Sequence, residues 1–356
     1  MGRRFGLSAW LAIILIVNIL GAAAAKAAPY AAFVMDARTG QIFYSENAET
    51  PLHPASLTKM MTLYLAFQAI QQGEISLDTE VRIAADAADE PPSRLGLREG
   101  QTIRLRYLLR AAAVKSANDA AMAIGYAIGG SREGFAARMN AMAAAMGMTG
   151  THFMNPNGLD NPQHLSTARD MSILGRHLVY DFPQYYNLFS RRTADAGIAQ
   201  VSSTNRRFLD SYEGADGIKT GFTNGAGYNL VASAQRGEVR IIATVFGGTS
   251  TADRNARVAH LLDIGFSKAP AHAEIVMTDP PVAVVPPAGE PAQVAVAEAP
   301  QDLGRVSGLV ETSLRPMPRP GSTVVAFAAE VPEKDIEDTL AEALAPPRRR
   351  SRPRSS

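Results

Sequence analysis

The sequence predicts an α+β fold, in which strands from both ends of one domain form a single sheet and helices lie between them. Three observations support this prediction. Residues 30–46 have the pattern of a β-hairpin. Apolar residues recur at helical spacing between residues 56 and 180, and strand-like segments return between residues 217 and 247. Strands, then helices, then strands differ from the regular alternation of a doubly wound βαβ fold.

The first elements are a hairpin and a helix. Apolar runs at 31–35 and 41–44 flank a turn-forming cluster at 36–40, which predicts two antiparallel strands. Apolar side chains at helix spacing then predict a helix over 56–71. Pro54 precedes this helix and does not interrupt it.

The middle of the domain is predicted to be helical. The pattern runs over 105–148, with breaks at 115–118 and at 129–130. Another helix is predicted over 169–180, with Ser166 or Thr167 as its N-cap.

The end of the domain returns to strands and closes with a helix. Segments 217–220, 227–234 and 239–247 predict an antiparallel series, the last two joined by a turn at 236–237. Residues 254–265 then predict an amphipathic helix.

Residues 1–27 are typical of an export signal. Arg3 and Arg4 precede an apolar stretch from Trp10 to Ala25, and residues 25–27 form the small-x-small pattern that a signal peptidase cuts. An uncleaved anchor helix is the alternative interpretation, because the stretch is only slightly short for a membrane span. We therefore expect an exported, periplasmic protein whose folded domain covers residues 28–268.

The composition changes after this domain. Fourteen of the 22 prolines lie between Pro270 and Pro353, which predicts a Pro/Ala-rich linker with little packed structure over 269–332. Residues 333–356 predict a short acidic helix and an arginine-rich tail. The acidic helix is a poor match to a membrane anchor. The tail is interpreted as a solvated end; weak contact with anionic lipid at the inner membrane, or with the cell wall, is the alternative.

Composition also excludes several classes of function. The formal net charge of +1 gives no reason to expect a nucleic-acid partner, and the absence of cysteine excludes disulfides, thiolate catalysis and Cys-ligated metals. We expect no metal and no cofactor, because the histidines lack the ligand spacing of a zinc peptidase. These histidines are His53, His152, His164, His177, His260 and His272.

The first chemical motif is Ser56-Leu57-Thr58-Lys59. Residues three apart lie on one face of a helix, which places the Ser56 hydroxyl beside the Lys59 amine. A desolvated lysine near other cations can be neutral and act as the base for a serine nucleophile. Taken alone, the motif is weak, since most such pairs are exposed on a helix surface.

Two further motifs follow at intervals of 60 and 103 residues. In Ser116-Ala117-Asn118, the hydroxyl can relay a proton and the amide of Asn118 can hold a substrate carbonyl. In Lys219-Thr220-Gly221, the lysine supplies charge, Thr220 a hydroxyl, and Gly221 allows a substrate backbone to approach. The three motifs in this order match the set found in β-lactamases and penicillin-binding proteins.

Longer segments resemble the low-molecular-mass penicillin-binding proteins, the serine D-alanyl-D-alanine carboxypeptidases of peptidase family S11. The resemblance is carried by residues 54–60, 155–159, 166–170, 216–223 and 226–234, and it covers roughly residues 28 to 266. It implies the serine β-lactamase/penicillin-binding fold, with a five-stranded antiparallel sheet flanked by helices.

The resemblance also implies roles for single residues. Ser56 would attack the penultimate D-Ala carbonyl of a peptidoglycan stem peptide and form an acyl-enzyme, with Lys59 as general base. Ser116, Asn118 and Lys219 would complete the proton network and position the substrate. β-Lactam antibiotics would act as covalent inhibitors.

The remaining assignments concern substrate binding. The backbone N–H groups of Ser56 and Phe222 would form the oxyanion hole, and Arg254 would hold the terminal carboxylate of the substrate. Arg254 as a solvated charge on the last helix is the alternative. Phe222 stands where some relatives have histidine.

Three alternative functions remain beside the carboxypeptidase. A β-lactamase would need a deacylating group, and class A enzymes have Ser-Asp-Asn where this chain has Ser-Ala-Asn. A DD-endopeptidase that cuts peptidoglycan cross-links would use the same motifs. A non-catalytic cell-wall scaffold would rely on the Pro-rich tail, but such a protein would be expected to lose a motif residue.

Overall fold

The computed structural model describes residues 28–276 and 280–283. The expectations for residues 1–27, for residues 333–356 and for most of the linker lie outside these described residues. Among the described residues, no helix is both long enough and apolar enough to cross a membrane.

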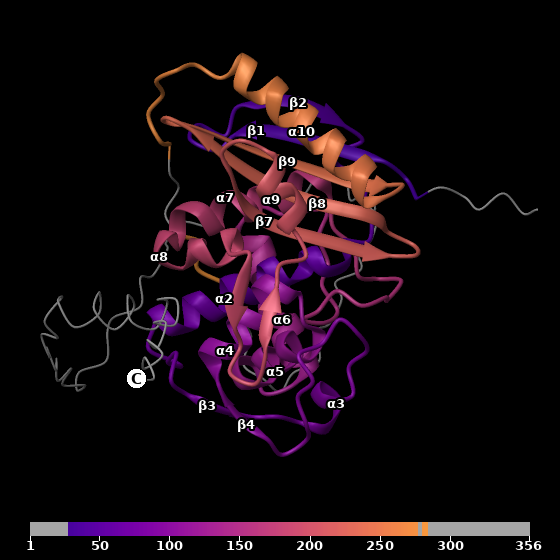
Figure 1. The fold of residues 1–356 in the computed structure, drawn as a ribbon, viewed down its shortest axis with the longest axis vertical. Coiled ribbons are helices and arrows are strands. Elements are labelled where there is room, and N and C mark those ends of the chain that lie inside the picture. Colours follow the sequence, from indigo (N-terminus) through magenta and orange to yellow (C-terminus); the bar gives the residue numbers. More distant parts are fainter. Residues whose placement is uncertain (1–27, 277–279, 284–356) are drawn as a thin grey trace, which may run out of the picture. The chain divides into compact units, whose positions relative to one another are not determined.

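A five-stranded antiparallel sheet, in the order β2-β1-β9-β8-β7, occupies the upper part of Figure 1. The N-terminal hairpin pairs with the last strand, so the sheet is assembled from both ends of the domain. This arrangement confirms the predicted α+β fold and its sheet. The strands are β1 (Ala31–Asp36), β2 (Ile42–Glu46), β7 (Ala215–Thr223), β8 (Gly227–Arg236) and β9 (Val239–Gly248).

Helices cover both faces of the sheet, and therefore its central strands do not alternate between apolar and polar residues. All six residues of β1 are buried. On one face, Val258, Leu261 and Leu262 of α10 (Thr251–Lys268) belong to the same buried cluster as sheet residues such as Val34. On the other face, Ser172 of α7 (Ala168–Asp181) shares a hydrogen bond of 2.6 Å with Thr244 of β9.

The helical part of the domain lies against the second face, below the sheet in Figure 1. The breaks predicted near 115–118 and 129–130 are confirmed, since Ser116 and Gly130 both adopt left-handed backbone conformations. The remaining helices are α2 (Lys59–Gln71), α4 (Leu105–Arg110), the π-helix η2 (Ala111–Lys115), α5 (Asn118–Gly129) and α6 (Arg132–Ala145).

Two helix starts refine the predictions. The helix expected from residue 56 begins as the 3-10 turn η1 (Ala55–Thr58) and becomes an α-helix at Lys59. The N-cap of α7 is Thr167, one of the two predicted residues, and its side chain accepts a hydrogen bond of 3.0 Å from the Asp170 N–H.

Several short elements were not predicted, because segments of three to six residues are too short to show a periodic pattern. The pairs β3–β4 and β5–β6 form two small antiparallel sheets outside the main one. These elements are β3 (Glu80–Arg82), α3 (Ala85–Ala88), β4 (Thr102–Arg104), α8 (Pro183–Tyr186), η3 (Asn187–Ser190), β5 (Thr193–Asp195), β6 (Gln200–Ser202) and α9 (Arg206–Ser211).

The residues after α10 are hydrogen bonded to the domain. We call residues 269–276 the C-terminal strap. Arg38, which is 2% exposed, pairs with Asp36 at 2.8 Å and donates to the carbonyls of Pro270 at 2.7 Å and Ala271 at 3.2 Å. The Val276 N–H in turn donates to the Arg38 carbonyl at 2.9 Å. The beginning of the predicted linker therefore completes the surroundings of a buried guanidinium.

This contact predicts that a chain ending at Lys268 is less stable than one ending at Ala283. The shorter chain leaves two donor groups of Arg38 without their carbonyl acceptors, a loss of about 1–3 kcal/mol in the free energy of unfolding. Urea denaturation of the two chains measures the difference. Equal midpoints and slopes would show that the strap does not stabilise the domain.

Candidate active site

The three motifs meet at a cavity of about 360 Å³ between the edge strand β7 and the helical part. Of the nine predicted site residues, seven line it and two, Lys59 and Lys219, lie buried behind its wall. The lining residues are Ser56, Pro92, Ser93, Ser116, Asn118, Gly158, Leu159, Thr204, Thr220, Gly221, Phe222, Thr223, Tyr228, Thr251 and Arg254.

The turn that carries Ser56 is held in an unusual conformation. Ala55 has a φ of 49°, in the left-handed region that non-glycine residues seldom adopt. Behind it, the Thr58 hydroxyl is 2.8 Å from Nε2 of His164, whose Nδ1 accepts a hydrogen bond of 3.1 Å from the Met154 N–H. Because Nδ1 is an acceptor, the ring is neutral and donates from Nε2 to Thr58. Burial lowers the pKa of His164 to about 3, in agreement with a neutral ring.

Lys59 is completely buried, and its amine has three polar partners. Nζ lies 2.7 Å from the Asn118 Oδ1, 2.7 Å from the Asn157 carbonyl oxygen and 3.0 Å from the Ser56 Oγ. The first two partners are oxygens that can only accept, whereas the hydroxyl of Ser56 can also donate. A neutral amine, with two hydrogens and one lone pair, therefore satisfies all three contacts.

The environment favours this neutral form. Burial, followed by repulsion from Lys219, holds the pKa of Lys59 well below its ordinary value, while Glu90 and Asp119 act in the opposite direction. The predicted proximity of Ser56 and Lys59 is thus present, together with the desolvation that the chemistry needs.

Ser116 faces the second buried lysine. The Lys219 Nζ donates to the Ser116 Oγ at 2.8 Å and to the Thr220 carbonyl at 3.0 Å. Ser116 has a φ of 64°, so the chain turns sharply between η2 and α5 and presents its hydroxyl to the cavity. Burial and the nearby Arg254 lower the pKa of Lys219 to about 7.

Asn118, the first residue of α5, is bound by the protein on both sides of its amide. Oδ1 accepts from Lys59, and Nδ2 donates to the Pro91 carbonyl at 2.8 Å. The backbone N–H of Asn118 donates to the Ser93 carbonyl at 2.7 Å. Asn118 therefore binds Lys59, a role additional to the substrate contact predicted from the sequence.

Gly221 has a structural role that the motif did not indicate. A Cβ atom at this position would lie 2.7 Å from the Pro54 carbonyl oxygen and 3.3 Å from the Leu57 nitrogen. The missing side chain thus allows β7 to pack directly on the turn of the serine, in addition to any approach of substrate. The preceding Thr220 shares a hydrogen bond of 2.9 Å with Thr204 across the cavity wall.

Phe222 and Arg254 lie at the outer part of the site. The Phe222 ring is 49% exposed and packs against Tyr228 with the ring centroids 4.4 Å apart. Arg254 is only 4% exposed, and burial lowers its pKa to about 10. It donates to Asn255 Oδ1 at 2.9 Å and, weakly, to the Asn229 carbonyl at 3.4 Å. Within the described part of the chain, its guanidinium makes no ion pair with a carboxylate.

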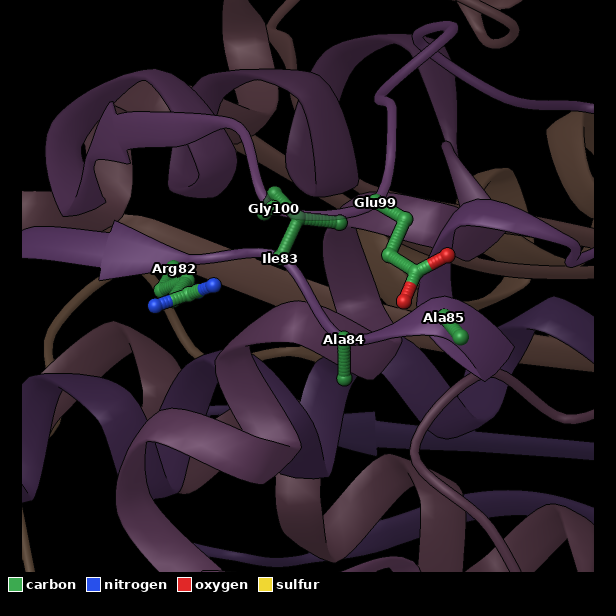
Figure 2. Close-up of a pocket in the computed structure, with 6 residues that line it drawn as sticks. All are labelled: Arg82, Ile83, Ala84, Ala85, Glu99 and Gly100. Atoms are coloured by element: carbon green, nitrogen blue, oxygen red, sulfur yellow. The ribbon is translucent and has the colours of Figure 1, made fainter.

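A second hollow of about 330 Å³ lies away from these motifs (Figure 2). It is open to solvent at the rim, where Arg82 and Glu99 are exposed. Residues 82–85 and 99–100 line it, and none of the motif residues does.

Comparisons with known proteins agree with this geometry. A family model described as Peptidase_S11, D-alanyl-D-alanine carboxypeptidase, matches residues 19–250. The chain belongs to peptidase family S11.

A relative of known name supports the assignment. The chain is 36% identical over 246 residues to the D-alanyl-D-alanine carboxypeptidase DacF of Bacillus subtilis, a match that covers 68% of this chain and 63% of that protein. The chain therefore spans less than two thirds of that relative's length.

Solved structures have the same fold. The D-alanyl-D-alanine carboxypeptidase DacD of Francisella tularensis aligns with a TM-score of 0.64 and 32% identity, over 68% of this chain and 71% of that one. Penicillin-Binding Protein D2 of Listeria monocytogenes, solved in an ampicillin-bound form, aligns with a TM-score of 0.61 and 32% identity, over 66% of this chain and 96% of that one.

Several residues of this S11 site were not predicted. Asn157 and Leu159 lie in a segment that carried the family resemblance, but the sequence does not indicate that a backbone carbonyl there would contact Lys59. Thr204 lies in no motif, and its place in the cavity wall follows only from the packing of residues before α9 on β7.

We predict that Gly221→Ala reduces covalent labelling by a penicillin at least tenfold. The added Cβ would displace β7 from the turn that carries Ser56, and displacements of about 1 Å can cost about 100-fold in rate. Gly225→Ala is the control, because no atom lies within 4 Å of its added Cβ. Equal labelling rates for both variants and the unmodified chain would contradict the argument.

A second prediction concerns the pH dependence of stability. The amine of Lys219 has a pKa of about 7 in the fold and about 10.4 when the chain is unfolded, so between these values the unfolded state binds more protons. The free energy of unfolding should therefore gain a contribution that rises from pH 7 to pH 10. Denaturation of the unmodified chain and of Lys219→Met at pH 7 and pH 9 measures it. The contribution should disappear in the variant. An equal change in the free energy of unfolding between pH 7 and pH 9 in both proteins would show that Lys219 is protonated in the fold.

Proposed function

We propose that the chain is a serine-type D-Ala-D-Ala carboxypeptidase, which removes the terminal D-alanine from peptidoglycan stem peptides through an acyl-enzyme on Ser56. The observation that carries this proposal is the Lys59 amine, buried and 3.0 Å from the Ser56 Oγ, with its two other contacts to oxygens that can only accept. Membership of family S11 and the DacF relative support the choice of substrate.

Lys59 is the general base in this proposal. Its two hydrogens are directed to Asn118 and Asn157, which leaves the lone pair for the hydroxyl proton of Ser56. The Ser56 oxygen forms a bond to the penultimate D-Ala carbonyl carbon as Lys59 takes the proton. Burial and the nearby Lys219 lower the pKa of this amine, which favours the unprotonated base.

Ser116 and Lys219 deliver a proton to the leaving group. As the C–N bond breaks, the amine of the terminal D-alanine needs a proton, and the Ser116 hydroxyl lines the cavity within reach of such a group. Lys219, 2.8 Å behind it, can replace the proton that Ser116 gives up. A water molecule then adds to the acyl carbon and gives up a proton, which restores Lys219 through Ser116. The Ser56 oxygen leaves with the proton that Lys59 returns.

The negative oxygen that develops on the carbonyl requires donors. We assign these to the backbone N–H groups of Ser56 and Phe222, and each such donor is worth on the order of 3 kcal/mol. The close packing of Gly221 on the turn at residues 54–57 supports this assignment, because it brings β7 and the serine turn together.

Arg254 is assigned to the carboxylate of the terminal D-alanine. It lines the cavity, it is buried, and its contacts within the described residues are to neutral oxygens, so its charge is available for an anion. Thr220, paired with Thr204, lies on the same wall and offers hydroxyl donors. A single anion-binding group suits a substrate with a free carboxyl terminus.

Location and inhibition follow from the same proposal. Peptidoglycan lies outside the cytoplasmic membrane, which agrees with the export signal expected at residues 1–27 and with a periplasmic protein. The similar Penicillin-Binding Protein D2, solved in an ampicillin-bound form, supports the inhibition of this chain by β-lactams. The catalytic domain is assigned to residues 28–268, with the strap as its extension.

The test uses the purified full chain with a fluorescent penicillin and with a pentapeptide ending in D-Ala-D-Ala. Ser56→Ala should lose covalent labelling and reduce D-alanine release more than about 1,000-fold, because the nucleophile is absent. Ser267→Ala, a change at an exposed serine of α10, is the matched control and should behave as the unmodified chain.

Other outcomes separate the alternatives. Labelling without release of D-alanine, but with cleavage of cross-linked peptides, would indicate an endopeptidase. Neither labelling nor release from a folded chain would overturn the enzymatic proposal.

A further inference from the structure

Glu90 is a buried carboxylate that the proposed mechanism does not use. It is 4% exposed and lies between α3 and the loop that leads to the cavity. Its Oε1 accepts a contact of 3.3 Å from Arg132, the first residue of α6, and Arg132 is also 3.8 Å from Asp86. A carboxylate rarely remains buried unless it is paired, so its position requires an explanation.

The segment that begins with Glu90 holds Asn118. The carbonyl of Pro91 accepts from the Asn118 side chain at 2.8 Å, and the carbonyl of Ser93 accepts from its backbone N–H at 2.7 Å. The Ser93 hydroxyl also donates to the Lys115 carbonyl at 3.2 Å. Residues 90–93 therefore fix the amide that contacts Lys59, and the ion pair of Glu90 with Arg132 anchors the start of this segment to α6.

Asn157 connects Glu90 to Lys59 from the other side. Its backbone carbonyl accepts from the Lys59 amine at 2.7 Å. Its side-chain amide, on a residue 1% exposed, lowers the pKa of Glu90, although its nitrogen makes no hydrogen bond within the described residues. The two acceptors of the Lys59 amine, Asn118 and Asn157, are thus both next to Glu90.

The other buried acid near Lys59 is held by backbone donors. The carboxylate of Asp119 accepts four backbone N–H groups at 2.8 to 3.1 Å, from Ala120 and from residues 95–97. These hydrogen bonds use the Asp119 carboxylate to fix the loop of residues 95–97. Within the described residues, the ion pair of Glu90 is with Arg132, whose side chain is 37% exposed and therefore partly solvated.

We propose that Glu90 is a positioning residue for Lys59: it anchors residues 90–93, which hold Asn118, and it places a negative charge beside the groups that bind the Lys59 amine. This inference rests on the proposed function of Lys59. The reciprocal effects on the two groups agree with it, since Glu90 raises the pKa of Lys59 and Lys59 lowers that of Glu90.

Other charged groups act on the same pair. Lys59 also faces Lys219 from β7 and Asp119 from α5, and it is near His164, which is neutral. Glu90 also faces Arg132 from α6 and Asp86 from α3. Burial is the largest effect on Glu90 and raises its pKa, and Asp86 acts in the same direction; Arg132, Asn157 and Lys59 oppose this shift without reversing it.

The first experiment measures penicillin acylation of the full chain between pH 5 and pH 10, for the unmodified protein and for Glu90→Gln. Glutamine keeps the shape and an acceptor for Arg132 but removes the charge. Without that charge, protonated Lys59 is less stable, so the acid limb of the profile should move to lower pH by about half to one unit. Glu133→Gln, an exposed change beside Arg132, should leave the profile unchanged.

A second variant tests the opposite sign. Arg132→Leu removes the cation that offsets Glu90, so the carboxylate acts more strongly on Lys59 and the acid limb should move to higher pH. The side chain of Arg132 is partly exposed, which makes this variant suitable even if Glu90→Gln folds poorly. Shifts in opposite directions support the proposal; an unchanged profile or a shift to lower pH in Arg132→Leu overturns it.

A direct titration keeps this result separate from the proposed reaction. The chain has six lysines, so NMR of ¹³Cε-lysine gives few signals, and the one absent from Lys59→Gln identifies Lys59. In Glu90→Gln its pKa should fall by the same half to one unit. Absence of acylation in the unmodified chain would defeat the proposed function, while the titration would still test Glu90. A lower rate at every pH with an unchanged Lys59 titration would show a purely structural role and overturn the proposal.

Discussion

The contact between the buried Lys59 amine and Ser56 is the interaction on which the rest of the site depends. A protonated lysine would need three acceptors and would hold the serine hydroxyl as one of them. A neutral lysine, with Asn118 and Asn157 as its acceptors, instead leaves a lone pair for the hydroxyl. Complete burial and the nearby Lys219 provide the physical reason for the neutral form. The neutral amine is therefore buried with only two hydrogens, and each of them has an acceptor.

The fold supplies this burial by joining distant segments. The sheet places β7 against the turn of residues 54–57, where Gly221 leaves no side chain between the backbones. On the opposite side, Gly158 approaches so closely that a Cβ atom there would overlap the Ala55 carbonyl oxygen. Its positive φ of 82° is a second reason for glycine at this position. Two glycines therefore enclose the serine turn, and the lysine behind it is shielded from solvent.

Such a site lowers stability, because buried amines lose hydration and are only partly compensated. The rest of the domain offsets this cost with burial and with paired charges placed elsewhere. The central strands are covered on both faces, and Arg38 is held by Asp36 and by the C-terminal strap. The ion pair of Glu90 with Arg132 has two effects. It stabilises the loop of residues 90–93, and its carboxylate acts electrostatically on Lys59.

The sequence by itself determined the elements and motifs whose information is local. Helical periodicity, the N-terminal hairpin and the final strands predicted the α+β fold, and the three motifs identified Ser56, Lys59, Ser116, Asn118 and Lys219 before any contact was known. Tertiary structure alone decided how these residues are charged and held. The Asn157 carbonyl, the Thr204 hydroxyl and the Glu90 carboxylate reach the site from segments that the chain brings together only on folding. A pKa depends on burial and on neighbouring charges, and neither quantity is written in the spacing of residues along the chain.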